Sequence, residues 1–278
     1  MVSRPLRIAS VNVNGVRAAF RRGMDAWLAT RDIDILALQE VRAETEDLTA
    51  LLGDEWDVVH DAASAKGRAG VAIASRHRAV IHRVAIGADD FDSAGRWLEA
   101  DYEVDGAELT VVSAYVHSGE AGTPRQREKY RLLTGMTERM RELGADGRRS
   151  LVVGDLNVGH RPLDIKNWKG NVARAGFLPK ERGYFDRWIG DPEKRGYNEG
   201  AGMGWVDIGR RFAGEVAGPY TWWSWRGKAF DLDSGWRIDY QLASPALAAS
   251  AIACTVDRAP SYAERWSDHA PVVADYSL

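Results

Sequence analysis

Pairs of polar side chains follow short apolar runs at several places in this sequence. The clearest case is RSLVVGDLNVGH, where Asp155 and Asn157 come directly after the apolar run 151–153. Side chains two residues apart on an extended chain point to the same face, and Gly154 and Gly159 allow the chain to turn there. The pattern predicts a carboxylate and an amide side by side at the carboxyl end of a strand, where open α/β sheets keep their sites.

Six further stretches have the same form, with polar residues where an apolar strand ends. They are NVNGVRAA with Asn12, LQE with Glu40, YVHSG with Tyr115, TWWSWRGKAF with Trp222, Trp223, Arg226 and Lys228, GWRIDY with Arg237 and Asp239, and SDHAPV with Asp268 and His269. Each stretch alone has an ordinary interpretation as a turn or cap, because Asp and Asn are common there. Seven together favour one site built from several strand ends.

Oxygen donors dominate this set. The carboxylates are those of Glu40, Asp268 and Asp155, and the amides are those of Asn12 and Asn157. Such hard donors suit Mg²⁺ or Mn²⁺, whereas zinc is usually bound by clusters of His and Cys. The six histidines are scattered singly, without HxH or HExxH spacing. Because Mg²⁺ held by few carboxylates neutralises phosphoryl oxygens, the pattern predicts hydrolysis of a phosphodiester.

The elements that must position these residues alternate along the first third of the chain, which predicts α/β layering. Strand patterns cover residues 7–13, 33–41 and 70–75, and helix patterns cover 24–30 and 43–52.

Antiparallel pairing is expected further on, because Asp105-Gly106 between strands 97–104 and 107–117 is a strong hairpin signal. An amphipathic helix is predicted over 125–143, a loop-rich stretch over 160–218, and strands again over 236–244 and 270–278. Two sheets packed face to face, with helices outside, would accommodate this many strands.

The composition is that of one large domain. The chain has 278 residues, of which 45% are hydrophobic, and we expect residues 1–278 to form a single catalytic domain. No stretch approaches the roughly 20 apolar residues of a membrane span. The single cysteine, Cys254, excludes an intramolecular disulfide and fits a reducing cytosol. A net charge of −3 does not indicate nucleic-acid binding, so any basic face must be local.

The seven stretches, in this order and across nearly the whole chain, resemble the exonuclease III class of apurinic/apyrimidinic endonucleases. The resemblance implies a four-layered α/β sandwich of the deoxyribonuclease I type, with two packed mixed β-sheets flanked by helices. It also implies Mg²⁺ dependence, with Mn²⁺ able to substitute, and cleavage of DNA 5′ to an abasic site. Members often add 3′-to-5′ exonuclease and 3′-phosphodiesterase activity. The expected substrate is double-stranded DNA with abasic sites or blocked 3′ ends, cut by a cytoplasmic, nucleoid-associated monomer of bacterial type.

The resemblance also implies roles at the metal. Glu40 matches the principal metal carboxylate, with Asn12 and Asp268 close to the same ion. Asp155 matches the residue that activates the attacking water or exchanges its proton, and Asn157 matches the partner that positions Asp155 and steadies the phosphate. Asp155 and Asn157 are therefore expected next to the ion as well.

Further roles concern the phosphate. Tyr115 matches the tyrosine that hydrogen-bonds the phosphate or the leaving oxygen, His269 matches the phosphate-side histidine, and Asp239 matches the carboxylate that orients it. Adjacent residues point oppositely in a strand, so Asp268 and His269 must lie in a loop if both face one phosphate. Pro271 makes such a loop plausible.

The segment TWWSWRGKAF has two interpretations. In a strand, Trp222 and Trp223 would point to opposite faces, so one of them must find cover outside the core. As a DNA element, one of these rings would pack on an abasic sugar or a base while Arg226 and Lys228 meet phosphates. We expect Trp222 or Trp223 at the abasic pocket, with Arg237 as a further DNA contact. The remaining tryptophans, including Trp236, are expected to be structural.

Two positions depart from the family pattern. His117-Ser118 stand where many members have Pro-Asn, and Asp233-Ser234 precede Gly235 where an Asn is common. These departures put substrate preference in question more than reaction class. The alternatives are a phosphodiesterase or phosphatase acting on lipid or inositol phosphates, and a DNA-binding protein without catalysis. The Trp-rich basic segment disfavours the first, and the complete polar set disfavours the second.

Overall fold

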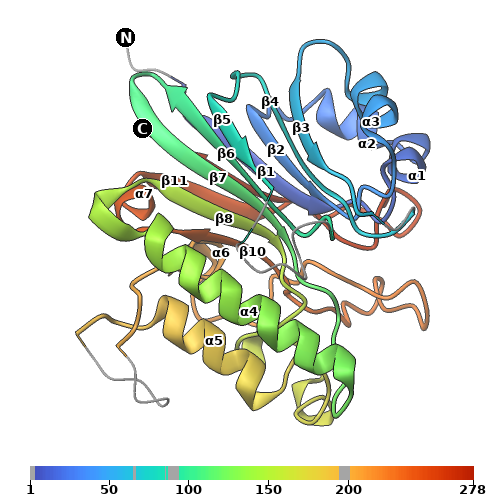
Figure 1. Ribbon diagram of the computed structural model, residues 1–278. Helices are drawn as coiled ribbons and strands as arrows, with labels where there is room; N and C mark the ends of the chain where they lie inside the picture. The colour runs from blue at the N-terminus through green and yellow to red at the C-terminus, as the bar shows by residue number, and fades with distance from the viewer. Residues whose placement is uncertain (1–3, 65–66, 85, 87–93, 194–200) are drawn as a thin grey trace.

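Two six-stranded sheets stack face to face in the computed structural model, which describes residues 4–64, 67–84, 86, 94–193 and 201–278 (Figure 1). Sheet A has the order β11-β12-β1-β2-β4-β3, and sheet B has the order β5-β6-β7-β8-β10-β9. The strands of sheet A are β1 (Leu6–Asn12), β2 (Ile35–Gln39), β3 (Asp57–Asp61), β4 (Val71–Ser75), β11 (Ala251–Val256) and β12 (Val272–Tyr276). Those of sheet B are β5 (Ile81–Arg83), β6 (Trp97–Val104), β7 (Ala107–Tyr115), β8 (Ser150–Asp155), β9 (Val206–Asp207) and β10 (Asp239–Ala243).

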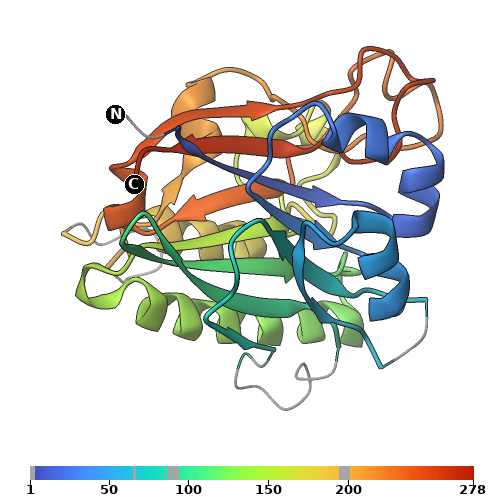
Figure 2. The same ribbon diagram turned by 90° about the horizontal axis from the view of Figure 1, so that it is seen from above.

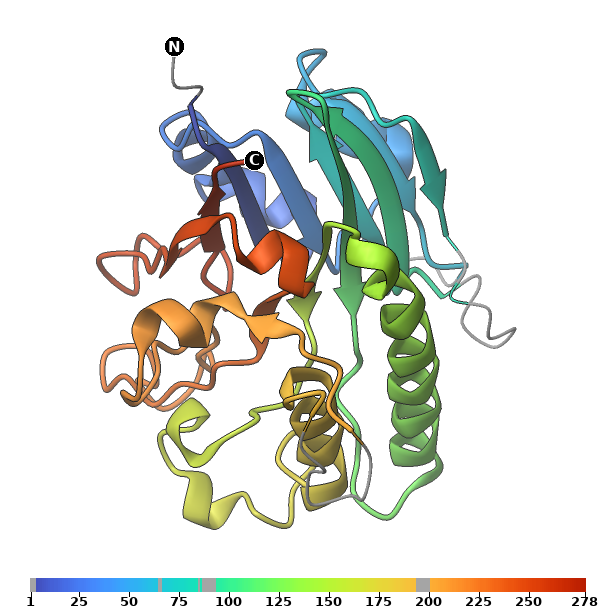
Figure 3. The same cartoon turned by 90° about the vertical axis from the view of Figure 1, so that its left-hand side faces the viewer.

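Both sheets are mixed, because β1 pairs with β2 and β7 with β8 in parallel while the other pairs are antiparallel. Helices cover the outer faces of both sheets (Figure 2). Sheet A is covered by α1 (Val16–Arg21), α2 (Met24–Leu28) and α3 (Thr45–Leu52), and sheet B by α4 (Pro124–Leu143) and α5 (Pro179–Ile189). Helices α4 and α5 lie side by side (Figure 3). These four layers confirm the predicted sandwich.

Shorter elements complete the fold. They are α6 (Ile208–Ala213), α7 (Pro245–Ala248) and the 3₁₀ turns at Ala145–Gly147, Pro162–Asp164 and Trp168–Gly170. Within the described residues, no helix combines the length and the apolar character needed to cross a membrane.

Alternation along the strands divides the apolar interior into three layers. In β1, Ile8 faces the other sheet while Ala9 faces the helices outside sheet A. In β8, Val153 likewise faces the other sheet while Val152 packs under α4 and α5. Strands β1 and β8 are therefore buried on both faces, which explains why their sequences are nearly continuous apolar runs.

Two buried amide side chains cross the space between the sheets. Gln39 of β2 donates a hydrogen bond from Nε2 to Ser113 Oγ of β7, at 3.0 Å. Gln241 of β10 donates from Nε2 to Ile8 O (3.1 Å) and to Val272 O (2.9 Å), both in sheet A. These buried amide groups keep their hydrogen bonds in only one position of sheet A relative to sheet B. The amides therefore determine how one sheet lies on the other.

The predicted hairpin is confirmed, since Asp105 and Gly106 both adopt positive φ, at 51° and 79°, between β6 and β7.

The prediction of a loop-rich stretch over 160–218 is wrong in part, because α5 and α6 form there. Residues 194–200 of this stretch lie outside the described residues. Helix α5 escaped recognition because it is largely charged and buries few apolar side chains. Strands β3, β5 and β11 were also missed, being short or only partly buried.

We expect Gly154→Ala to lower the free energy of unfolding by roughly 2–4 kcal/mol, because overpacking and a strained backbone each cost about 1–3 kcal/mol. Gly154 has φ of 136°, and a Cβ there would lie 2.0 Å from Ala114 O on β7. Urea denaturation measures the loss. Gly170→Ala is the matched control, since nothing lies within 4 Å of its added Cβ. Equal losses in both variants would contradict the steric argument.

Candidate active site

A cavity of about 370 Å³ opens at the edge where strands of both sheets end. Eight of the predicted residues line it: Asn12, Glu40, Tyr115, Asp155, Asn157, Trp222, Asp268 and His269. Asp239 lies directly beneath it, against His269. The cavity therefore brings together residues that are as far apart in the chain as 12 and 269.

Strand register places three of these side chains at one level of sheet B. Asp155 is opposite Tyr115 on β7 and opposite Asp239 on β10. On sheet A, Asn12 ends β1 opposite Gln39, and Glu40 follows immediately with φ of 50°. The sheets contribute the two sides of the cavity because the ends of β1, β2, β7 and β8 lie at the same edge.

Amide groups surround the buried Asp155. Asn12 Nδ2 donates to Asp155 Oδ2 (2.9 Å) and to Glu40 Oε1 (3.1 Å). Asn157 donates its backbone N to Asp155 Oδ1 (2.9 Å) and its Nδ2 to Oδ2 (3.0 Å), so the two side chains lie together as predicted. Burial raises the pKa of Asp155, and the imidazolium of His269 partly offsets this. A carboxylate with a raised pKa is a better proton acceptor.

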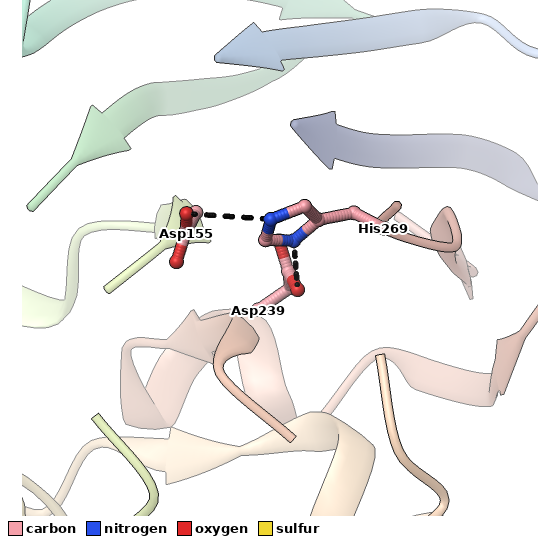
Figure 4. Close-up of side chains that lie close together, drawn as sticks. All are labelled: Asp155, Asp239 and His269. Carbon is pink, nitrogen blue, oxygen red and sulfur yellow. Dashed lines mark hydrogen bonds and ion pairs between the residues drawn. The ribbon is translucent and has the colours of Figure 1, made fainter. Parts of the chain in front are cut away.

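His269 is held between two carboxylates (Figure 4). Its Nδ1 lies 2.9 Å from Asp239 Oδ2, and its Nε2 lies 3.8 Å from Asp155 Oδ2. Burial alone would lower the pKa of His269, but the charges of Asp239 and Asp155 outweigh it and raise the pKa to about 10. The imidazole is therefore a cation at neutral pH. Asp268 and His269 both face the cavity from an irregular segment before β12, as the adjacency of the two residues required.

Two groups of side chains have metal-binding chemistry. Ligand atoms of Asp155, Asp239 and His269 lie within 4.8 Å of one another. A protonated histidine has no lone pair to offer, however, so this group fits a metal poorly while His269 is charged. Glu40 and Asp268 offer carboxylate oxygens at the cavity, which suit a hard cation such as Mg²⁺.

Asn12 presents its nitrogen, not its oxygen, to the carboxylates, because its Oδ1 accepts a hydrogen bond from Asn14 N at 2.9 Å. For Asn12 to bind a metal ion, its side-chain amide would have to flip so that Oδ1 and Nδ2 exchange places.

Trp222 is the tryptophan of its segment that reaches the cavity. Its Nε1 donates to Asp268 Oδ2 at 3.2 Å, and its ring meets that of Trp236 edge to face, with centroids 6.4 Å apart. Trp236, expected to be structural, also lines the cavity. Arg226 and Lys228 are exposed on the loop that follows.

Two predicted DNA contacts are corrected. Trp223 is 2% exposed, packs on Phe230 and donates Nε1 to Asp233 Oδ1 at 3.0 Å. Arg237 is also 2% exposed, because ion pairs with Asp164 and Asp207, each 2.7 Å, hold it in the interior. Neither side chain is placed to touch DNA.

Three residues that line the cavity had no assigned role, and a fourth such residue lies beside it. Asn14 donates Nδ2 to Asp268 Oδ1 at 2.9 Å, and its position two residues after Asn12 was a usable signal. Arg42 forms an ion pair with Glu40. Ser118 lines the wall. Arg96 does not line the cavity but places its guanidinium 5.4 Å from the ring of Tyr115, a contact that no local pattern predicts.

Burial raises the pKa of Tyr115, and the nearby Glu40 carboxylate raises it further, so Tyr115 remains a neutral hydrogen-bond donor.

The two departures from the family pattern have unequal effects on the cavity. Ser118 reaches the cavity, whereas His117 is buried with Nε2 3.2 Å from Arg125 O. Asp233 faces Trp223 instead of the cavity. Only Ser118 therefore alters the wall.

The chain matches known proteins over nearly its whole length. A family model described as the endonuclease/exonuclease/phosphatase family matches residues 9–269. An exodeoxyribonuclease of Bacillus subtilis (strain 168) is 31% identical over 270 residues, covering 96% of this chain and 98% of the relative.

Two solved structures are similar over 98% of this chain. An AP endonuclease from Archaeoglobus fulgidus has a TM-score of 0.81 and 26% identity, with 100% of that chain covered. A 3′ phosphatase from Neisseria, bound to a product DNA hairpin, has a TM-score of 0.83 and 28% identity, with 99% covered.

We expect Asp239→Asn to lower the pKa of His269, which is about 10 in the metal-free protein. The substitution removes the charge and the hydrogen bond of the nearer carboxylate, while burial, which disfavours the cation, is unchanged. NMR titration of the imidazole nitrogens in chelator measures this. A His269 titration unchanged by the substitution would show that Asp239 does not hold the proton.

Proposed function

We propose that this protein cuts double-stranded DNA 5′ to abasic sites. The chain belongs to the endonuclease/exonuclease/phosphatase family and to its exonuclease III class of apurinic/apyrimidinic endonucleases. The chain is a phosphodiester-hydrolysing nuclease. One observation carries the proposal: Glu40, Asp155 and His269 share a single cavity with Trp222 on its wall. An acid-base pair, a metal carboxylate and an aromatic surface meet where a DNA linkage would have to bind.

The proposal extends to 3′-to-5′ exonuclease and 3′-phosphodiesterase activity on blocked 3′ ends. The similarity to the Neisseria 3′ phosphatase supports this extension. We further propose that residues 1–278 act as a single catalytic domain, as a monomer, in the cytoplasm and at the nucleoid.

Mg²⁺ is the proposed cofactor, with Mn²⁺ able to replace it. Glu40 and Asp268 would hold the ion, with Asn12, Asp155 and Asn157 beside it. When bound, the ion neutralises charge on the phosphate oxygens. The two carboxylates support this assignment, because Mg²⁺ is usually bound through one or two carboxylates together with substrate phosphates and water.

The protein groups handle protons and orientation. Asp155 accepts the proton of the attacking water, because burial makes it basic and Asn157 holds it in place. The cationic His269 donates to a phosphate oxygen on which negative charge develops, and Asp239 keeps it protonated. Tyr115 donates its phenol proton in a hydrogen bond to the phosphate or the leaving oxygen.

The walls supply recognition. Trp222 and Trp236 present aromatic surface on which an abasic sugar can pack. The exposed Arg226 and Lys228 meet backbone phosphates beyond the cavity.

We expect the protein to nick a duplex carrying one tetrahydrofuran site on the 5′ side of the lesion, in the presence of Mg²⁺ and not of chelator. Asp155→Asn should slow incision about 1,000-fold, within the range for loss of a general base, while gel-shift affinity changes little. Asp54→Asn, an exposed carboxylate, is the control. Hydrolysis of inositol or lipid phosphates without incision would replace the DNA proposal with the alternative.

We expect Glu40→Ala to raise the Mg²⁺ concentration for half-maximal incision at least about ten-fold, because a lost carboxylate ligand weakens the ion's binding. Glu46→Ala, at an exposed position on α3, is the control. A Mg²⁺ titration identical to that of the wild type would remove Glu40 from the ligand set.

A further inference from the structure

A buried ion pair lies between α4 and α5, behind the cavity. Lys129 of α4 and Glu181 of α5 are both fully buried, with Lys129 Nζ 2.6 Å from Glu181 Oε1. Taking two charges out of water is costly, and an apolar pair of similar size often serves stability as well. The pair therefore calls for a role other than holding the two helices together.

The hydrogen bonds of the pair lead to the cavity wall. Lys129 Nζ donates to Asn157 O at 2.8 Å. Glu181 Oε2 accepts from Gly176 N (2.7 Å) and Leu178 N (2.9 Å). Both Asn157 and Gly176 line the cavity, so one ion pair holds two separate parts of its wall.

Asn157 needs this support because of its backbone. It adopts φ of 49°, the left-handed region, and in this conformation its backbone N and its Nδ2 both reach Asp155. The hydrogen bond from Lys129 fixes the direction of the Asn157 carbonyl. It therefore also fixes the plane of the peptide that links Asn157 to Val158. Without that bond, the carbonyl would be a buried acceptor that has lost its charged donor.

Gly176 is packed against the same carbonyl. A Cβ at Gly176 would lie 3.2 Å from Asn157 O and 3.0 Å from the ring of Trp236. Because Glu181 holds the backbone N of Gly176, it sets the distance between Asn157 and the tryptophan wall.

We propose that Lys129 and Glu181 are positioning residues for the cleavage reaction, with Lys129 orienting Asn157 and Glu181 fixing the Gly176 segment beside it. This inference rests on the proposed nuclease function. Neither side chain touches the cavity, so each acts through the residue that it holds.

The test compares Lys129→Met with the double variant Lys129→Met/Glu181→Gln. Lys129→Met should lower the single-turnover rate of incision about 10–100-fold, the range for outer hydrogen-bond partners, with duplex affinity in chelator within about 3-fold. The double variant removes the unpaired charge, so its thermal midpoint should recover toward that of the wild type while its rate stays low. A rate that recovers together with the midpoint would overturn the proposal.

Lys180→Met is the matched control, because Lys180 is exposed on α5 next to Glu181 and its loss should leave the rate unchanged. A second measurement needs no substrate: hydrogen exchange of the Asn157 side-chain amide, followed by NMR. Faster exchange in Lys129→Met supports the positioning role, and unchanged exchange contradicts it. Wild-type protein that fails to cut the tetrahydrofuran duplex would instead overturn the proposed function, and the amide measurement would still decide the role of the pair.

Discussion

The position of one sheet on the other is the constraint on which this molecule depends. Hydrophobic contact is non-directional and would permit the sheets to slide, but the amides of Gln39 and Gln241 are satisfied in one arrangement only. At the edge, the bond from Asn12 to Asp155 continues the same connection into the cavity. Because Asn12 and Glu40 lie at the end of sheet A while Asp155 and Asp239 lie at the end of sheet B, the site exists only in that arrangement.

Burial then gives the assembled residues their chemistry. In water a histidine would be mostly uncharged at neutral pH and an aspartate would be a weak base, because each titrates near its ordinary pKa. Here desolvation makes Asp155 more basic, while the carboxylate of Asp239 keeps His269 cationic in spite of desolvation. A base and an acid thus stand 3.8 Å apart, at the closest contact of their side chains. The same low dielectric strengthens the bonds that orient them.

Local patterns predicted the direction of a side chain where strand alternation holds, and they failed where it does not. Asp155 and Asn157 were found because strand alternation and a following turn decide where they point. Trp223 and Arg237 were misassigned because residues 220–238 form only isolated bridges. Outside a regular strand, successive side chains need not alternate between two faces. The two layers of the sheets followed from the number of strands, but the burial of Arg237 depends on Asp164 and Asp207, at remote positions.

Four residues at the cavity turn the chain through the left-handed region: Asn14 (φ 47°), Glu40 (φ 50°), Arg42 (φ 53°) and Asn157 (φ 49°). Residues other than glycine adopt this conformation rarely, Asn more readily than most, and for β-branched residues it is nearly forbidden. Each position is thus restricted twice, by the functional group it must carry and by the turn it must make. Ser118, by contrast, lines the cavity without a positive φ, so a new side chain at this position meets no such conformational barrier.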